Sequence, residues 1–126
     1  MNDTTKNQIE RLKRLLPEYK YYQHGCNLAT YNAGILQKRV IIDGKTACFI
    51  TIDINNMHLE FRHAEDFVSF QAVLRMYPKN KSCYEHQIHF NFNMLSNDDE
   101  IIAGMKDLEE YCLVLFNTNL FSHYEY

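Results

Sequence analysis

The residues best suited to bind a ligand lie at alternate positions of two extended stretches. His58, Glu60 and Arg62 alternate with apolar residues, so they would share one face of a strand. Glu85 and His89 lie on the polar side of a second alternating stretch. Side chains two positions apart on a strand are roughly 7 Å apart, close enough to contact one ligand. The pattern predicts a binding site on a polar sheet face, although a solvated face with cross-strand charge pairs would look the same.

A second group of candidate ligands is an acidic run at the start of a segment with helical periodicity. Asp98, Asp99 and Glu100 offer carboxylate oxygens, which are hard ligands suited to iron or calcium. The run lacks the spacing of an EF-hand loop, and a solvated helix face explains it equally well. His86 and His89 could not chelate one metal from a regular strand, because odd and even positions face opposite ways. Metal binding by the acidic run is therefore the alternative interpretation.

The sequence contains no recognisable catalytic motif. No serine or cysteine stands in a nucleophile elbow, and the four glycines are too scattered for a phosphate-binding loop. The cysteines at positions 26, 48, 83 and 112 include no Cys-x-x-Cys pair. This spacing favours buried free thiols over a disulfide framework or a zinc site. The sequence indicates a non-enzymatic protein, for which we expect no cofactor.

Hydrophobic periodicity predicts the elements that would position these residues. The Asp43-Gly44 pair favours a tight hairpin turn, because both central residues of a type I′ turn need positive φ. The strand after this turn should bury Cys48, Ile50, Ile52 and Ile54, with Ala47 on the other face. Helices are predicted over residues 4–16, 17–23, 64–77 and 97–116, and strands over 28–31, 35–42, 46–54, 57–61 and 84–94. Ser96 should cap the last helix.

Length and composition indicate one domain. The chain has 126 residues, of which 46% are hydrophobic, and contains only four glycines and two prolines. We expect a single α+β domain over residues 1–126, with 119–126 as a C-terminal tail. Its sheet should be mostly antiparallel, with four to five strands and the N- and C-terminal helices packed on one face. Because the N-terminus does not resemble a signal peptide and no stretch could span a bilayer, we expect a cytoplasmic protein without membrane contact.

Charge is distributed unevenly along the chain. Residues 1–45 hold eight Lys and Arg against four Asp and Glu, whereas residues 46–126 hold five against twelve. The acidic majority argues against nucleic-acid binding, whose affinity comes mainly from neutralised phosphates. Opposite charges in the two parts, and aromatic residues near both ends, suggest a protein partner and allow a homodimer. A tail folded onto its own domain would account for the aromatic residues in a monomer.

Short motifs along residues 9–116 carry a family resemblance. They include Leu16-Pro17-Glu18, Asp43-Gly44-Lys45, His58-Leu59-Glu60-Phe61 and Gln87-Ile88-His89-Phe90. In order and spacing they resemble the small bacterial YdhG-like and YjbR (MmcQ)-like proteins, whose fold is related to the frataxin (CyaY-like) domain. The Lys-Lys-His-Trp motif typical of YjbR-like chains is missing, and residues 32–42 look inserted. The resemblance implies the fold and, for the YdhG-like branch, iron handling, but it supplies no catalytic residues.

These observations lead to two functional expectations. The first is a non-enzymatic cytoplasmic binding or adaptor protein that acts through protein contacts at the polar sheet face. The alternative is a frataxin-like iron carrier that uses Asp98, Asp99 and Glu100.

Overall fold

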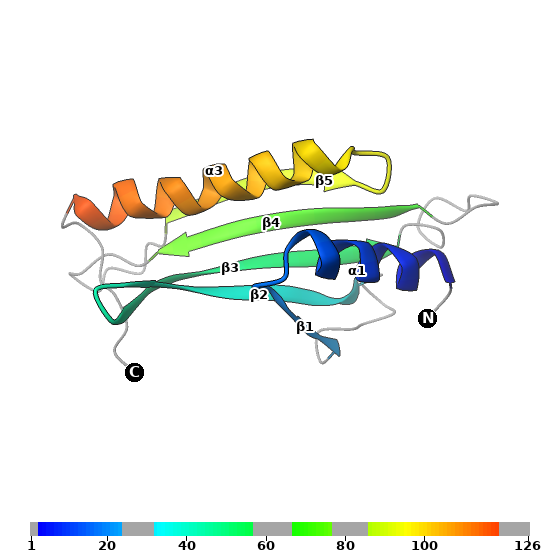
Figure 1. The fold of residues 1–126 in the computed structure, drawn as a ribbon, viewed down its shortest axis with the longest axis horizontal. Helices are drawn as coiled ribbons and strands as arrows, with labels where there is room; N and C mark the ends of the chain where they lie inside the picture. Colours follow the sequence, from blue (N-terminus) through cyan, green and yellow to red (C-terminus); the bar gives the residue numbers. More distant parts are fainter. Residues whose placement is uncertain (1–2, 24–31, 57–66, 77–85, 119–126) are drawn as a thin grey trace.

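A computed structural model describes residues 3–23, 32–56, 67–76 and 86–118. Its elements are α1 (Asp3–Leu15), β1 (Lys20–Tyr22), β2 (Asn32–Ile42), β3 (Lys45–Asn56), β4 (Val68–Met76), β5 (His86–Asn93) and α3 (Asp98–Asn117). The strands form one five-stranded sheet in which each pairs antiparallel with its neighbour along the chain, in the order β1-β2-β3-β4-β5. Figure 1 shows α1 and α3 on the same face of this sheet. The predicted α+β architecture is confirmed.

The core lies between the sheet and the two helices. On β3, Cys48, Ile50, Ile52 and Ile54 are fully buried, as the alternation predicted. The other strands and the helices complete this layer with Leu36, Val68, Phe70, Ala72, Leu74, Met76, Phe92, Ile9, Leu12, Ile101, Met105 and Leu108. Neither described helix has the length and hydropathy of a membrane-spanning segment.

The hairpin between β2 and β3 follows the predicted turn chemistry. Asp43 and Gly44 have φ values of 54° and 77°, both in the left-handed region that a type I′ turn requires. Two positions farther into the hairpin the register shifts: Val40 pairs with Cys48, but Ile41 pairs with Thr46. Ala47 is therefore the extra residue of a β-bulge. Its side chain is buried in the core, although the sequence predicted it on the face opposite to Cys48.

The helix predicted over residues 17–23 is wrong, because Lys20–Tyr22 form strand β1. The helix α1 ends before Pro17, and a tight turn follows in which the Tyr19 amide donates to the Leu16 carbonyl at 3.0 Å. Tyr21 then pairs with Leu36 of β2, and its hydroxyl donates to the Ala33 carbonyl at 2.7 Å. Pairing with a neighbouring strand overrides the weak helical spacing of this short segment. The strand predicted over 28–31 lies outside the described residues, as does the strand over 57–61.

The helix predicted over residues 64–77 is also wrong, because Val68–Met76 form strand β4. The spacing of Phe67, Phe70 and Leu74 fits a helix, but Phe70 and Leu74 are also four positions apart on one face of a strand. Val73, on the face opposite to Leu74, is only 3% exposed. Val73 thus interrupts the alternation of apolar and polar residues from Val68 to Met76, which makes the strand pattern harder to recognise than that of β5.

The last two elements agree closely with the sequence prediction. Strand β5 covers most of the predicted range, and α3 begins at Asp98, one residue later than expected. The N-cap is Asn97 instead of Ser96: its side chain accepts from the Glu100 amide at 2.8 Å and donates to the Glu100 carboxylate at 3.2 Å. The helix start therefore has an N-cap side chain one residue later than predicted, reinforced by a side-chain contact with Glu100. The buried side of α3 consists of Ile101, Met105, Leu108 and Cys112, whereas Ile102 is 43% exposed.

Arg11 of α1 joins the first helix to the turn between β5 and α3. Its guanidinium donates to the Asp98 carboxylate at 2.8 Å, and also to the backbone carbonyls of Met94 and Ser96. Carbonyl oxygens and a carboxylate thus share one planar donor group, a geometry for which arginine is suited. The contact fixes the N-terminal end of α3 relative to α1.

A second polar cluster joins α3 to β2 through Lys38. The Lys38 ammonium donates to Glu109 at 3.0 Å and to Glu18, and lies 5.9 Å from the centre of the Tyr19 ring. The Tyr19 hydroxyl donates to the same Glu109 carboxylate at 3.1 Å. Burial, and then the Glu109 charge, raises the pKa of Tyr19. Burial acts to lower the pKa of Lys38, but the two carboxylates outweigh it and the pKa is raised.

Stability should therefore fall at alkaline pH. In the unfolded chain tyrosine and lysine titrate near pH 10 and 10.4, whereas the folded state keeps both protons to higher pH. This stabilisation is complete at pH values below the unfolded-state pKa values. It is lost as the pH rises through the folded-state pKa values. We expect the free energy of unfolding to drop above about pH 10 by roughly 1.4 kcal/mol per pH unit for Tyr19, and by less for the partly exposed Lys38.

Urea unfolding at several alkaline pH values tests this expectation. Tyr19→Phe should make the decline shallower, whereas Tyr111→Phe, at a tyrosine that is 47% exposed, should leave it unchanged. An identical alkaline slope in the wild type and in Tyr19→Phe would contradict the role given to Tyr19.

Candidate functional site

The structure describes one of the five residues predicted to form the binding site. His89 lies exposed on β5, with Nδ1 3.3 Å from the Gln71 amide nitrogen and Nε2 3.2 Å from the Gln87 amide oxygen. His58, Glu60, Arg62 and Glu85 lie outside the described residues. The polar surroundings of His89 agree with the prediction, and its grouping with the other four residues stays a prediction.

Side-chain alternation creates a second sheet face, on the side opposite to α1 and α3. By strand register it consists of Lys20, Tyr22, Ile35, Gln37, Arg39, Phe49, Thr51, Asp53, Asn55, Ser69, Gln71, Val73, Arg75, Gln87, His89, Asn91 and Asn93, and we call it the polar face. Side-chain amides and hydroxyls predominate on it. The polar face is therefore rich in neutral hydrogen-bonding groups.

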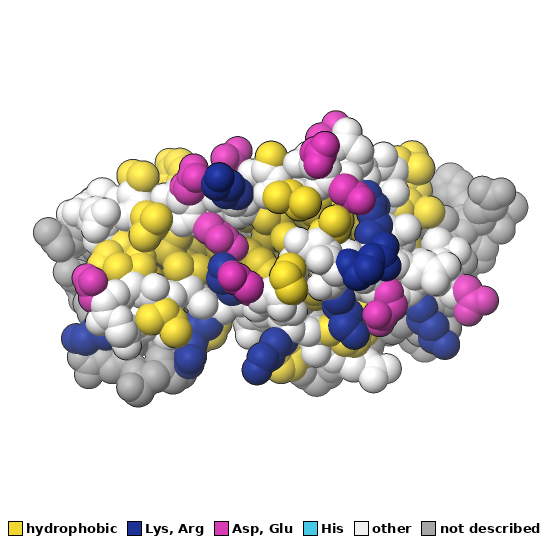
Figure 2. All heavy atoms as spheres, viewed as in Figure 1, with side chains coloured by type: hydrophobic (Ala, Val, Ile, Leu, Met, Phe, Trp, Pro, Cys, Tyr) yellow, Lys and Arg dark blue, Asp and Glu magenta, His cyan; other side chains and the backbone are white. Residues whose placement is uncertain are grey.

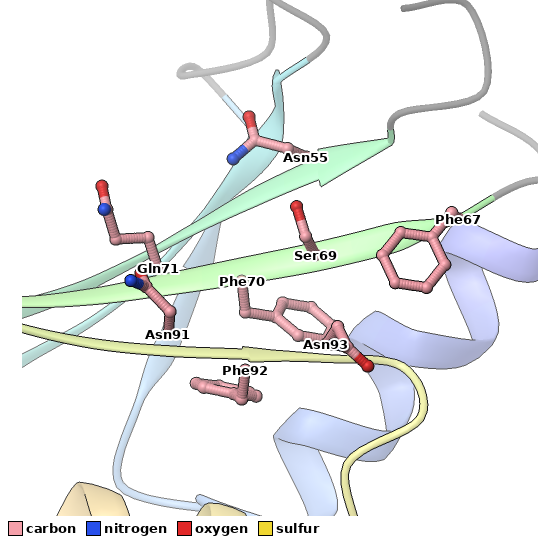
Figure 3. A pocket seen from close by; sticks show the side chains of 8 residues that line it. All are labelled: Asn55, Phe67, Ser69, Phe70, Gln71, Asn91, Phe92 and Asn93. Carbon is pink, nitrogen blue, oxygen red and sulfur yellow. The ribbon is translucent and has the colours of Figure 1, made fainter. Parts of the chain in front are cut away.

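One end of the polar face contains a pocket of about 400 Å³, which we call the amide pocket. Its lining residues are Asn55, Ser69, Gln71, Asn91, Asn93, Phe67, Phe70 and Phe92. In Figure 3, Asn55, Ser69 and Gln71 project from β3 and β4 to one side of the sheet, whereas the rings of Phe70 and Phe92 lie on the other side. The amide pocket thus lies over the aromatic part of the core.

The amide pocket offers hydrogen-bonding groups without charge. A carboxamide both donates and accepts hydrogen bonds, and none of the described lining residues is ionisable. Asp53 pairs with Gln71 in the strand register. Burial raises the pKa of the Asp53 carboxyl group, and the positive charge of Arg75 lowers it by a smaller amount. Such a lining can satisfy the polar groups of a neutral ligand, but these residues offer no paired nucleophile and base.

A second pocket, of about 460 Å³, lies where the short strand β1 begins, and we call it the basic pocket. Lys20 and Arg39 contribute its cations from the polar face, and Lys38 reaches it from the other side while paired with Glu18. Tyr22, Gln37, Ile41 and Phe49 complete the lining. The two pockets place neutral amides at one end of the polar face and positive charge at the other.

The acidic run proposed as a metal site lies in the first turn of α3. Asp98 forms an ion pair with Arg11 at 2.7 Å, and Glu100 forms the capping contacts with Asn97. All three carboxylate residues of the run are exposed. In the described part of the chain, no group of three His, Cys, Asp or Glu side chains could hold a metal ion. These contacts explain the run as a capped and charge-paired helix start.

Sequence reasoning missed most of the amide pocket. Asn91 and Asn93 share the polar side of β5 with His89 by alternation, but an amide side chain gives no distinctive ligand signal in the sequence. Ser69 and Gln71 were missed because residues 64–77 were interpreted as a helix. The signal that could have found them is the alternation of apolar residues from Val68 to Met76, which leaves both polar side chains on one face.

Comparison with protein-family models, curated proteins and solved structures found no match. The resemblance to YdhG-like and YjbR-like proteins therefore stays a prediction.

Proposed function

We propose that this chain is a cytoplasmic, non-enzymatic binding protein whose polar face holds an extended, acidic segment of a partner protein. The observation that carries the proposal is the placement of the two pockets. The amide pocket spans β3, β4 and β5, and the basic pocket lies at β1 and β2 on the same sheet. An elongated ligand could contact both.

Amide chemistry favours a peptide as the occupant. A peptide unit presents one N–H donor and one C=O acceptor, and the side chains of Asn55, Gln71 and Asn91 each offer the complementary pair. An extended peptide also repeats every two residues, close to the spacing of side chains along the strands beneath it. The amide pocket can therefore bind backbone groups with little dependence on the peptide's side chains.

Charge favours an acidic segment over a neutral or basic one. The described residues of the polar face carry three cations, Lys20, Arg39 and Arg75, against the single carboxylate of Asp53. The chain as a whole has a net charge of −3, so the polar face is positive on an otherwise acidic protein. Complementary charge increases the rate of encounter and discriminates against wrong partners.

Selection from a random linear peptide library tests this proposal without knowledge of the natural partner. The immobilised full-length chain should enrich acidic peptides, whose synthetic versions are then titrated by fluorescence anisotropy. We expect Arg39→Glu to weaken binding by about tenfold, or roughly 1.4 kcal/mol. Gln71→Ala should weaken it by less, since a neutral hydrogen bond contributes about 0.5–1.5 kcal/mol.

The matched control is Lys13→Glu, which makes the same kind of charge change on α1, on the other side of the sheet. It should leave peptide affinity within about twofold of the wild type. Enrichment of basic peptides, failure to enrich any peptide, or an equal loss in Lys13→Glu would overturn the proposal.

The iron-carrier alternative has less support. Asp98 pairs with Arg11, and no specific contact favours a metal over this capped helix start. Calorimetric titration with ferrous and ferric iron would revive it if binding were lost when Asp98, Asp99 and Glu100 are replaced by alanine. Homodimer formation likewise stays a prediction, which light scattering at low and high salt would test.

A further inference from the structure

Two cysteines from distant parts of the chain face each other in the core. Cys48 is on β3 and Cys112 is on α3, 64 positions apart in sequence, and both thiols are free and fully buried. Their Sγ atoms are 2.8 Å apart, compared with about 2.05 Å in a disulfide bond. Strand and helix therefore already hold the two sulfurs where a small movement would join them.

Cys112 lies near the C-terminal end of α3, whereas Cys48 lies within a paired strand. Cys112 is the last residue of the buried stripe of α3, and its neighbours Tyr111, Leu113 and Val114 are 47%, 46% and 61% exposed. Figure 2 shows hydrophobic side chains at the surface between the C-terminal half of α3 and the β2–β3 hairpin. Opening of the last helical turns, which are the part of a helix that frays most readily, would expose Cys112 before Cys48.

The contact also gives the two thiols different acidities. The hydrogen bond between them lowers the pKa of Cys112, with burial opposing, and raises the pKa of Cys48, with burial adding to the effect. Because the thiolate is the nucleophile in thiol chemistry, this direction agrees with the position of Cys112 near the end of α3, where opening of the helix would expose it first.

We propose that Cys48 and Cys112 form a thiol–disulfide exchange site that is oxidised by a small disulfide of the glutathione class. The Cys112 thiolate attacks one sulfur of the oxidant, forming a mixed disulfide and releasing one glutathione thiolate. Cys48 then attacks Cys112 Sγ, which forms the Cys48–Cys112 bond and releases the second glutathione. The two protons of the cysteines pass to the two glutathione thiolates, so two protein thiols and one glutathione disulfide give one protein disulfide and two glutathione thiols.

Oxidation would attach α3 covalently to the sheet. A cross-link between residues 64 positions apart removes much freedom from the unfolded chain, so the oxidised form should unfold at a higher temperature, by on the order of 10 °C. Neither cysteine lines the amide pocket or the basic pocket, so this inference does not depend on the proposed function.

The test uses full-length protein in which Cys26 and Cys83 are replaced by serine, so that only the described pair can react. The protein is equilibrated with mixtures of reduced and oxidised glutathione, with and without mild urea to open α3. Alkylation and mass spectrometry should show joint loss of two thiols, with a cross-linked peptide pair containing residues 48 and 112. Dithiothreitol should reverse both the cross-link and the rise in unfolding temperature.

A variant with Cys48→Ala in the same background provides the control. It should show no rise in unfolding temperature with glutathione disulfide, and in urea its Cys112 should stop at the mixed disulfide. Persistence of both thiols in urea, or glutathione on either cysteine without the internal cross-link when both are present, would overturn the proposal.

Discussion

Replacing Phe70 with alanine is expected to lower the free energy of unfolding by about 3–5 kcal/mol. The Phe70 ring is 2% exposed and stacks on Phe92, with ring centres 4.9 Å apart. Phe70 belongs to central strand β4 and Phe92 to its neighbour β5, so the truncation leaves a cavity that the surrounding strands cannot readily fill. Urea denaturation followed by circular dichroism would measure the loss.

Val114→Ala is the matched control, because Val114 is 61% exposed on α3. Its effect should remain within about 0.5 kcal/mol, as is usual for surface positions. A loss below about 1 kcal/mol for Phe70→Ala would contradict the placement of this ring in the core.

Gly104→Ala is expected to destabilise the protein by about 1–3 kcal/mol, although alanine is the better helix former. A Cβ atom at Gly104 would lie 2.2 Å from two ring carbons of Phe90 on β5. The glycine thus lets α3 approach the sheet, and an added methyl group must displace either the ring or the helix. Phe90 also stacks on Phe92 at 5.1 Å, which limits its movement.

A double-mutant cycle isolates this steric effect. In a Phe90→Ala background the clash disappears, and Gly104→Ala should then stabilise the protein by up to about 1 kcal/mol through helix propensity alone. The sign of the Gly104→Ala effect should therefore reverse between the two backgrounds. The same sign and size in both would mean that Phe90 does not limit the helix position.

Elements with a strong local signal were predictable from the sequence. The Asp43-Gly44 turn, the alternation on β3 and β5, and the stripe of α3 all depend on contacts within a short segment or on one exposed face. Strand β4 was harder to predict, because Val73 interrupts its alternation of apolar and polar residues and its apolar residues also fit a helix. Strand β1 is three residues long and forms by pairing with β2. The propensities of its own residues do not predict this pairing.

The same distinction applies to the candidate site. The polar side of β5 was read correctly at His89, because alternation alone determines it. Prediction of the amide pocket requires the register in which three strands pair. Because β4 was predicted as a helix, its residues Ser69 and Gln71 could not be placed beside Asn91. The contact between Cys48 and Cys112 was equally hidden, since two apolar stripes predict burial for each thiol but not their meeting.

The order of the strands also has a consequence for how the protein assembles during synthesis. Each strand pairs with the one made just before it, so the sheet can extend as the chain emerges, beginning with the two-residue turn between β2 and β3. Of the described elements, α3, which contacts β5 and β3, is made after all five strands. Until α3 emerges, the rings of Phe70 and Phe92 have only part of their cover, and the nascent chain carries an apolar sheet surface to which chaperones could bind.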